Sequence, residues 1–394
     1  MARFLIIHTD GNTYNNPTLK CIIDLLKENN GEIDIRYPVT NAPMPNMPGV
    51  RLLPYGKILH IIKQIILDKI YSKTLAFLSI MWERLIYYRR YDLIIAVDRH
   101  GLIEAGILFQ LTRTPVVYFS FEIMFACETS HAFKQLEKKA SKFVSYWFVQ
   151  DEIRAKCLEI ENGMNPSSKS LLPLASCGPG HFGSKRLRDK LRIPPHKHVA
   201  IIMGSLCEWT MTREIIASVA TWPEEWVLVV HERYGLTGDA ISRLCIEKRT
   251  IDTSRIYFSD SSETMIDEMG FVLSGVSVGI AFYRPDYKSP YTGKNLKYLG
   301  LASGKISTFM RYGIPILTNE IGTYADLIRK HHLGMVVDHP RAIGRNLPTL
   351  IGHSFRDNAR RFFDENLDFN IFRNDVWKKI SSIIVCQSKS LRLQ

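Results

Sequence analysis

Paired cysteines and long uncharged apolar runs are both missing from this sequence of 394 residues. Its seven cysteines stand apart without a Cys-x-x-Cys pair, which argues against a zinc site and against a disulfide framework. No run of about 18 apolar residues is free of charge, so we expect no membrane-spanning helix. The first apolar run, residues 4–7, is too short for the core of a signal peptide and predicts a buried strand. We therefore expect a cytoplasmic protein, in solution or peripheral on the cytoplasmic face of a membrane.

Several ligand-binding motifs are missing as well. Neither half of the chain carries Gly-x-Gly-x-x-Gly after its first predicted strand, which argues against a nicotinamide-dependent dehydrogenase. No Asp-x-Asp pair follows a predicted strand, and Asp286 stands alone, so we expect neither a metal ion nor a cofactor. The chain contains no recognised nucleic-acid-binding motif, and we expect no nucleic-acid partner despite its net charge of +12.

Positive charge is concentrated in residues 51–90, where eight Lys or Arg face two acidic residues, a local excess of +6 (8 minus 2). Within this region, residues 57–80 place a stripe of isoleucines, Ile58 to Ile70, along one face of a predicted helix, with lysines away from it. Such a helix is suited to lie against anionic lipid, so residues 57–90 are a candidate membrane surface. The same pattern fits a core helix with a solvated basic face, and that alternative stays open.

Short apolar runs alternate with helical patterns in both halves of the chain. We predict strands at residues 4–7, 33–36, 92–97, 116–119, 198–203, 227–230, 256–258, 276–282, 314–318 and 334–337. Strict alternation of strand and helix is typical of a parallel sheet covered on both faces. The sequence therefore predicts an α/β protein with two Rossmann-like, doubly wound parallel-sheet domains facing a cleft.

The segment between the two halves is rich in proline, glycine and basic residues, as domain boundaries often are. We expect a first domain at 1–175, a linker at 176–197 and a second domain at 198–365. The amphipathic tail, 366–394, predicts a helix that crosses back to the first domain.

The most informative stretch runs from Ser303 to Asp326. Ser303, Gly304 and Lys305 open a predicted helix, and Gly322 with Thr323 opens another one. Helix N-termini present unpaired N–H groups and the positive end of a dipole, which suit phosphate oxygens. Lys305 adds a full positive charge beside them.

This stretch resembles the retaining group 1, or family 4, glycosyltransferases, which have the two-domain GT-B fold. The residues in register with the family pattern are Ser303, Lys305, Phe309, Met310, Gly313, Pro315, Gly322 and Asp326. The sequence is divergent in one motif: many members carry two glutamates eight residues apart, where this chain has Gly300 and Thr308.

The resemblance implies a transferase that moves a sugar from a nucleoside diphosphate, UDP or GDP, to a saccharide or lipid-linked saccharide. It places this activity in the biosynthesis of surface polysaccharides or other glycans, with retention of configuration. It also assigns the donor to the second domain and the acceptor to the first.

The donor residues follow from the same resemblance. The pyrophosphate is expected against Ser303, Lys305 and the start of the helix at Gly322, and Lys305 is expected to stabilise the leaving diphosphate. The full predicted donor set is Gly204, Ser205, His231, Glu232, Arg233, Arg284, Ser303, Gly304, Lys305, Ile306, Thr308, Gly322 and Thr323. A solvated lysine at position 305 and an ordinary loop histidine at position 231 remain alternatives.

Acceptor residues are expected after the strands of the first domain. The predicted set is Gly11, Asn12, Asp98, His100 and Glu122, of which His100 and Glu122 join Lys305 as candidate catalytic residues. A structural role as a cap or a hydrogen-bonded core residue is the alternative for each.

Two further functions fit the same sequence. A non-catalytic GT-B partner subunit would bind the donor without turnover, as Gly300 and Thr308 in place of the glutamates suggest. A relative with other chemistry, such as a nucleotide-sugar epimerase or an inverting transferase, would share the donor pocket.

Overall fold

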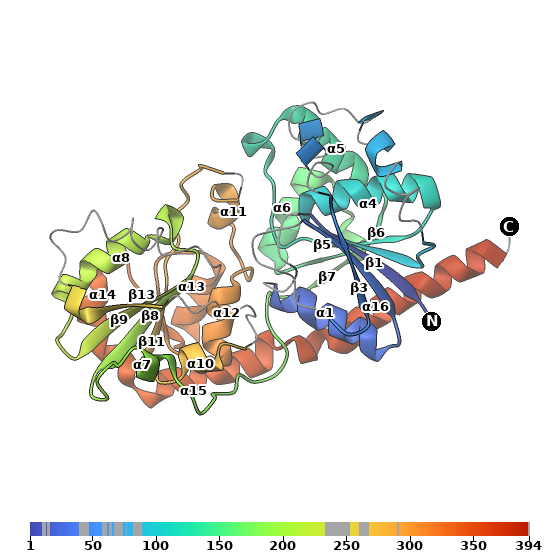
Figure 1. Cartoon of the computed structure of the whole chain (residues 1–394). Coiled ribbons are helices and arrows are strands. Elements are labelled where there is room, and N and C mark those ends of the chain that lie inside the picture. The colour runs from blue at the N-terminus through green and yellow to red at the C-terminus, as the bar shows by residue number, and fades with distance from the viewer. Residues whose placement is uncertain are drawn as a thin grey trace. The chain divides into compact units, whose positions relative to one another are not determined.

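The computed structural model describes residues 1–392 apart from 10–12, 14–15, 39–46, 57–60, 63–64, 67–73, 76, 82–88, 233–252, 260–267 and 290. The chain divides into two compact units (Figure 1). Unit 1 comprises Met1–Pro173 and Phe372–Gln394, and unit 2 comprises Leu174–Ile371. Within the described residues, no helix combines the length and the apolar character needed to cross a membrane.

The described part of unit 1 forms a parallel sheet of seven strands in the order β3-β2-β1-β4-β5-β6-β7. The strands are β1 (Arg3–His8), β2 (Glu32–Tyr37), β3 (Val50–Pro54), β4 (Leu93–Val97), β5 (Val116–Phe119), β6 (Val144–Val149) and β7 (Lys169–Leu171). Its helices include α1 (Pro17–Glu28), α4 (Asp98–Thr112), α5 (His131–Ser141) and α6 (Glu152–Asn162), with short 3-10 turns η3 (Ala126–Glu128) and η4 (Pro166–Ser168). The strand order reverses between β1 and β4.

The helices of unit 1 begin where the sequence supplies caps. The Asn16 side chain accepts a hydrogen bond from the Leu19 amide, and Pro17 takes the first helical position of α1, where no amide is needed. At the start of α4, a Cβ atom on Gly101 would lie 2.6 Å from the Ile7 carbonyl oxygen. Only glycine therefore lets α4 pack this closely on β1, next to the switch in strand order.

The described part of unit 2 forms a parallel sheet of six strands in the order β10-β9-β8-β11-β12-β13. The strands are β8 (His198–Gly204), β9 (Trp226–Glu232), β10 (Ile256–Ser259), β11 (Val278–Ala281), β12 (Ile316–Thr318) and β13 (Gly334–Val336). Here the strand order reverses between β8 and β11.

Helices and short turns connect these strands and follow the last of them. The helices are α7 (Leu187–Lys190), α8 (Thr212–Ser218), α10 (Gly270–Leu273), α11 (Lys294–Lys297), α12 (Gly304–Arg311), α13 (Thr323–Lys330), α14 (Ile343–Asn346), α15 (His353–Phe362) and α16 (Phe369–Arg392). The shorter turns are η5 (Glu208–Thr210), η6 (Val219–Thr221), η7 (Thr253–Arg255), η9 (Pro340–Ala342), η10 (Pro348–Ile351) and the π-helical η11 (Phe363–Leu367). From Phe372 onward, α16 belongs to unit 1.

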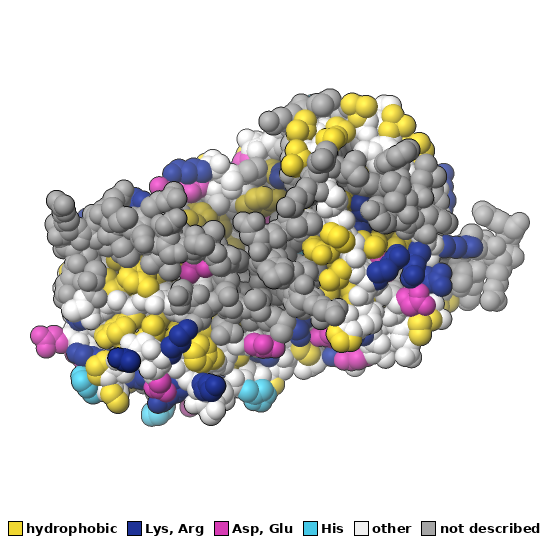
Figure 2. Space-filling view, in the orientation of Figure 1, with side chains coloured by type: hydrophobic (Ala, Val, Ile, Leu, Met, Phe, Trp, Pro, Cys, Tyr) yellow, Lys and Arg dark blue, Asp and Glu magenta, His cyan; other side chains and the backbone are white. Residues whose placement is uncertain are grey.

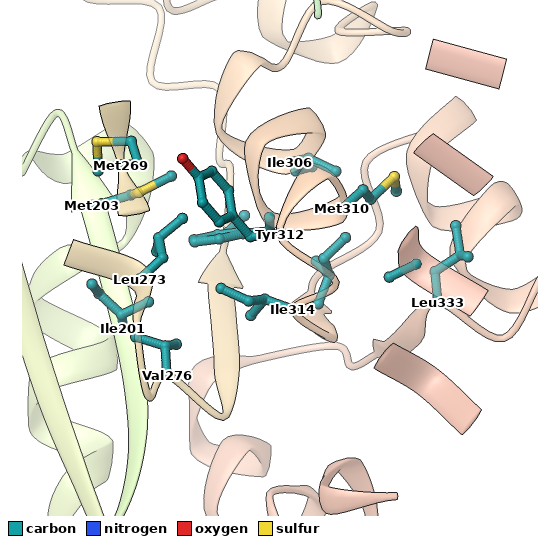
Figure 3. Packing of buried hydrophobic residues seen from close by; sticks show 14 of the residues in the cluster. Ile201, Met203, Met269, Leu273, Val276, Ile306, Met310, Tyr312, Ile314 and Leu333 are labelled. Carbon is teal, nitrogen blue, oxygen red and sulfur yellow. The ribbon is translucent and has the colours of Figure 1, made fainter. Parts of the chain in front are cut away.

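Strand β8 shows that the unit 2 sheet is covered on both faces. Its residues alternate between two hydrophobic clusters, with Ile201 and Met203 in one and Ala200 and Ile202 in the other. Figure 3 shows Met203 beside Met269 in the first cluster, to which α12 also contributes. The two α/β parallel-sheet units that the sequence predicted are therefore present.

The structure also departs from the expected elements. Residues 176–197, which we predicted as a linker, are grouped with unit 2, and their Leu187 and Ile193 side chains belong to its buried core. Strands β3, β6 and β7 were not predicted from the sequence. The pattern of β3 is masked by Arg51 and Pro54, which an edge strand tolerates.

Candidate functional site

The switch between β8 and β11 is the place where a ligand of unit 2 is expected. In doubly wound sheets, ligands bind beyond the carboxyl ends of the strands where the strand order reverses. Strand β8 ends there at Gly204, and Tyr283 follows β11 by two residues. We call the residues gathered at this switch the candidate donor site.

Lys305 lies across this switch. A Cβ atom on Gly204 would lie 3.6 Å from the Lys305 Cε atom, so the lysine stem runs beside the end of β8. The Lys305 ammonium group is 5.4 Å from the centre of the Tyr283 ring, beyond the end of β11. Gly204 has φ +92°, a conformation that favours glycine. Gly204 and Lys305, which are about a hundred residues apart in the sequence, are therefore neighbours in the fold.

Ser303 forms contacts with three segments of the candidate donor site: the start of α12, the residue Tyr283 beyond β11 and the start of α13. Its Oγ atom caps α12 by accepting a hydrogen bond from the Ile306 amide at 3.2 Å, and it lies 2.7 Å from the Tyr283 hydroxyl. The Tyr324 hydroxyl, from the start of α13, donates to the Ser303 carbonyl at 3.4 Å. The N-termini of α12 and α13 therefore lie next to each other and next to the end of β11.

Gly322 leaves room at the start of α13. It has φ +62°, and no described heavy atom beyond its chain neighbours lies within 4 Å of a Cβ atom built on it. Thr323 is the first residue of the helix. A backbone that is open on this side and precedes a helix N-terminus is suited to bind an anion.

The positive charge of Lys305 reaches the loop after β8. Cys207 caps η5 in this loop, and burial raises the pKa of its thiol. The charge of Lys305 acts in the opposite direction and lowers that pKa. The lysine therefore makes the potential at the end of β8 more positive, as anion binding requires.

Other predicted donor residues occupy the neighbouring strand end. Glu232 is the last residue of β9 and pairs in register with Gly204, and Ser205 comes directly after Gly204. His231 is fully buried, with its Nδ1 atom 3.1 Å from the Ser259 hydroxyl of β10. Arg233 lies outside the described residues.

Arg284 and two residues of α12 already have protein partners. The Arg284 guanidinium forms an ion pair with Glu214 at 2.7 Å, and about half of its side chain is exposed. The buried Thr308 hydroxyl donates to the Gly304 carbonyl at 2.7 Å, so its proton is used within the helix. The Ile306 side chain lies in the core. Phosphate contact at Arg284 and ribose contact at Thr308 stay predictions.

In unit 1, Asp98 joins the loops that follow β4 and β5. Asp98 has φ +54°, and its Oδ1 atom accepts hydrogen bonds from the amides of Phe121 (2.7 Å) and Glu122 (2.9 Å). His100 is buried and meets the Phe133 ring edge-on, with ring centres 5.4 Å apart. Asp98 and Glu122 are therefore close together, while Gly11 and Asn12 lie outside the described residues.

Beneath these residues lies Arg154, which is fully buried and was not singled out from the sequence. It donates to the Gln150 side chain and to the Phe121 carbonyl, each at 2.7 Å. Burial lowers the pKa of Arg154, and the negative charges of Glu122 and Asp98 are among those that oppose the change. This buried cation supports the loop that carries Glu122.

Sequence reasoning also missed Tyr283 and Trp209. Their rings stack with centres 6.0 Å apart, and the Arg284 amide donates to the Trp209 carbonyl at 2.8 Å. The aromatic residue directly after the run 276–282 was the available signal for Tyr283. Among the described residues, no group of three or more His, Cys, Asp or Glu side chains is placed to hold a metal ion.

No family model and no curated protein matches this chain. Solved structures do match it. HepE from Anabaena, in complex with UDP and glucose, is 15% identical with a TM-score of 0.67, over 97% of this chain and 100% of that chain. Sucrose-phosphate synthase from Thermosynechococcus elongatus is 12% identical with a TM-score of 0.68, over 98% and 100% of the two chains. WaaG, a glycosyltransferase involved in lipopolysaccharide biosynthesis, is 12% identical with a TM-score of 0.58, over 93% and 96%.

At sequence identities this low, the comparison shows a shared fold and does not assign roles to individual residues. The similarity extends over nearly the whole length of this chain and of each of these proteins. The resemblance that the motif at Ser303–Asp326 indicated is therefore confirmed for the architecture, and this chain has the GT-B fold of the glycosyltransferases.

Proposed function

We propose that this protein is a glycosyltransferase that takes a sugar from a nucleoside-diphosphate sugar bound to unit 2. The observation that carries the proposal is the position of Lys305 across the β8–β11 switch, between Gly204 and Tyr283. The structural neighbours support a nucleotide sugar as donor, since HepE has been solved with UDP-glucose.

The proposed chemistry follows from the charges at this site. Loss of the sugar leaves negative charge on the terminal oxygens of the diphosphate. A cation and helix-start amides that are already in place stabilise this charge more strongly in the transition state than in the bound substrate. Lys305, Ser303 and the backbone at Gly322 supply these groups, and no metal ion or other cofactor is part of the proposal.

For the acceptor we propose a saccharide or a lipid-linked saccharide bound by unit 1, in the biosynthesis of surface polysaccharide or another glycan. Glu122 supports this assignment because it lies beyond the end of β5, where a carboxylate can accept hydrogen bonds from sugar hydroxyls, and Asp98 orients that loop by accepting the Phe121 and Glu122 amides. Retention of configuration rests on the resemblance of the Ser303–Asp326 motif alone. His100 is buried against Phe133, so of the two proposed acid or base residues Glu122 is the more accessible.

We also propose that residues 57–90 contact an anionic membrane from the cytoplasmic side. In the described part of this segment Ile61, Ile62 and Ile65 are exposed, and Figure 2 shows hydrophobic side chains on the surface of unit 1. Of the other isoleucines of the predicted stripe, Ile66 is buried, and Ile58 and Ile70 lie outside the described residues. Sedimentation with anionic and with neutral vesicles tests the proposal, and equal sedimentation with both would contradict it.

The donor proposal is tested by thermal shift of the purified protein against UDP, GDP, ADP, TDP and CMP. A ligand that binds only the folded state raises the melting temperature, so one nucleotide should stand out. The Lys305→Ala variant should lose that shift, whereas Lys330→Ala, which removes an exposed lysine at the other end of α13, should keep it. If no nucleotide shifts the melting temperature, the proposed function is wrong.

A non-catalytic partner subunit is the second candidate, and Gly300 and Thr308 at the glutamate positions favour it. It predicts the same thermal shift without turnover. Release of the nucleoside diphosphate from the matching nucleotide sugar separates the two. Release that disappears in Lys305→Ala supports the enzyme, and binding without release in the presence of saccharide acceptors supports the subunit.

A further inference from the structure

We infer that Tyr283 is a positioning residue of the candidate donor site. Its hydroxyl group orients Ser303, and its ring holds the ammonium group of Lys305 where a diphosphate would bind. The inference rests on the proposed function, because it concerns how the same site meets its ligand. It goes further in that neither the motif at Ser303–Asp326 nor the predicted donor set includes this tyrosine.

The first argument is the hydrogen bonding of Ser303. A hydroxyl group has two acceptor lone pairs and one proton. One lone pair of Ser303 Oγ accepts from the Ile306 amide at 3.2 Å, and the Tyr283 hydroxyl lies 2.7 Å away. When Tyr283 donates, both lone pairs of Ser303 are occupied and its own proton is directed to a third group. A phosphate oxygen, which only accepts, fits that position.

The second argument is the placement of Lys305. Its ammonium group is 5.4 Å from the centre of the Tyr283 ring, within the range of a cation–π contact, and its stem runs beside Gly204. A free lysine side chain loses much rotamer entropy when a ligand orders it. A lysine held before the ligand arrives loses less, which increases affinity.

The third argument is that Tyr283 is itself held from both sides. Its backbone amide donates to the Asn319 side chain at 2.9 Å, and its carbonyl accepts from the same side chain at 2.7 Å. Its ring stacks on Trp209, and the residue is 6% exposed. A side chain fixed in this way can orient its neighbours, as a preorganised binding site requires.

Burial alone would be served by phenylalanine, so the hydroxyl group is the informative part of the residue. Tyr283→Phe keeps the ring in the core and keeps the contact with Lys305, but it removes the bond to Ser303. Tyr283→Leu removes the ring contact as well. Tyr287→Phe is the matched control, because Tyr287 lies in the same loop and is exposed.

The experiment is isothermal titration of these variants with the nucleoside diphosphate selected by the thermal-shift screen, UDP being the first probe, and with its nucleoside. We expect Tyr283→Phe to weaken binding of the diphosphate about three- to tenfold, to leave nucleoside binding unchanged and to match the melting temperature of Tyr287→Phe. Tyr283→Leu should weaken the diphosphate further.

Two results would overturn the inference while leaving the proposed function in place. One is unchanged affinity of Tyr283→Phe for the diphosphate. The other is an equal loss for nucleoside and diphosphate, which marks a purely structural tyrosine. If Tyr283→Leu does not fold, Tyr283→Phe alone decides the hydroxyl part of the inference. Failure of the unmodified protein to bind any nucleoside diphosphate would instead remove the proposed function, and this inference with it.

Discussion

The two units share a sheet topology, yet the residues beyond their strand ends differ in kind. In unit 2, the switch between β8 and β11 combines glycine backbones at Gly204 and Gly322 with the cation of Lys305. In unit 1, the ends of β4 and β5 carry the carboxylates of Asp98 and Glu122. The strand ends of unit 2 thus carry a cation and open glycine backbone, and those of unit 1 carry carboxylates, which are hydrogen-bond acceptors.

The two sites also differ in how far their polar groups are used by the fold itself. The Asp98 carboxylate accepts hydrogen bonds from backbone amides of the neighbouring loop, and the buried Arg154 donates a hydrogen bond to a carbonyl of the same loop. The Lys305 stem lies beside Gly204, and its ammonium group lies near the Tyr283 ring. Strand order locates a site, but its side chains decide whether a polar group serves stability or binding.

The largest effect is expected from Asp98→Ala in unit 1. The substitution leaves the buried Phe121 amide and the part-buried Glu122 amide without their acceptor and removes a negative charge near the buried Arg154, which should cost about 2–4 kcal/mol of unfolding free energy. Lys305→Ala should change that free energy by less than about 0.5 kcal/mol. Urea unfolding of both variants measures the two free energies. Equal losses of unfolding free energy would contradict the view that Asp98 serves stability and Lys305 does not.

The next effect concerns the backbone at Gly204. Gly204→Ala forces an alanine to φ +92° and puts a methyl group against the Lys305 stem, so we expect about 1–2 kcal/mol of destabilisation and about tenfold weaker nucleotide binding.

Gly163→Ala in unit 1 is the matched control, since Gly163 has φ +68° and open space around its Cβ position among the described residues. It should show a similar loss of stability in urea unfolding and no loss of affinity in titration. Reduced nucleotide affinity in this control would mean that backbone strain alone explains the result at Gly204.

A smaller effect tests whether buried polar groups in unit 1 serve stability. The buried Tyr55 hydroxyl donates to Glu104 at 2.7 Å, and burial raises the pKa of Tyr55 well above its ordinary value. Above about pH 10, the unfolded chain releases this proton while the folded chain keeps it, so stability falls as the pH rises. Tyr55→Phe should lose about 1 kcal/mol at neutral pH and show a weaker decline between about pH 9 and 11.

Urea unfolding across that pH range checks this prediction. An unchanged alkaline decline in Tyr55→Phe would show that other groups cause it.

The smallest expected effect tests whether Arg284 contacts phosphate. Glu214→Gln removes the ion-pair partner of a half-exposed arginine, which should leave stability nearly unchanged. If Arg284 contacts phosphate, its release should strengthen nucleotide binding about twofold at low salt. Titration of Glu214→Gln with the nucleotide at low and high salt measures this. If the substitution leaves the affinity unchanged at both salt concentrations, Arg284 is not part of the donor site.

The sequence predicted strands correctly where a strand is an uninterrupted apolar run. The strands predicted at 4–7, 92–97 and 116–119 overlap β1, β4 and β5, whose apolar residues are buried. β3 was not predicted because Arg51 and Pro54 interrupt its apolar pattern. Residues 176–197 were predicted as a linker from their proline-rich composition, which does not show that Leu187 and Ile193 pack in a core.

By itself, the sequence determined the alternation of strand and helix and the positions of the glycines and the lysine of the Ser303–Asp326 motif along the chain. These properties depend on neighbours along the chain, so they can be read from it. Only the tertiary structure decided which side chains meet across elements: Tyr283 with Ser303, Gly204 with Lys305, and Asp98 with the loop before Glu122. These residues are distant in sequence, and the parallel sheet brings them together because all its strands end at the same edge.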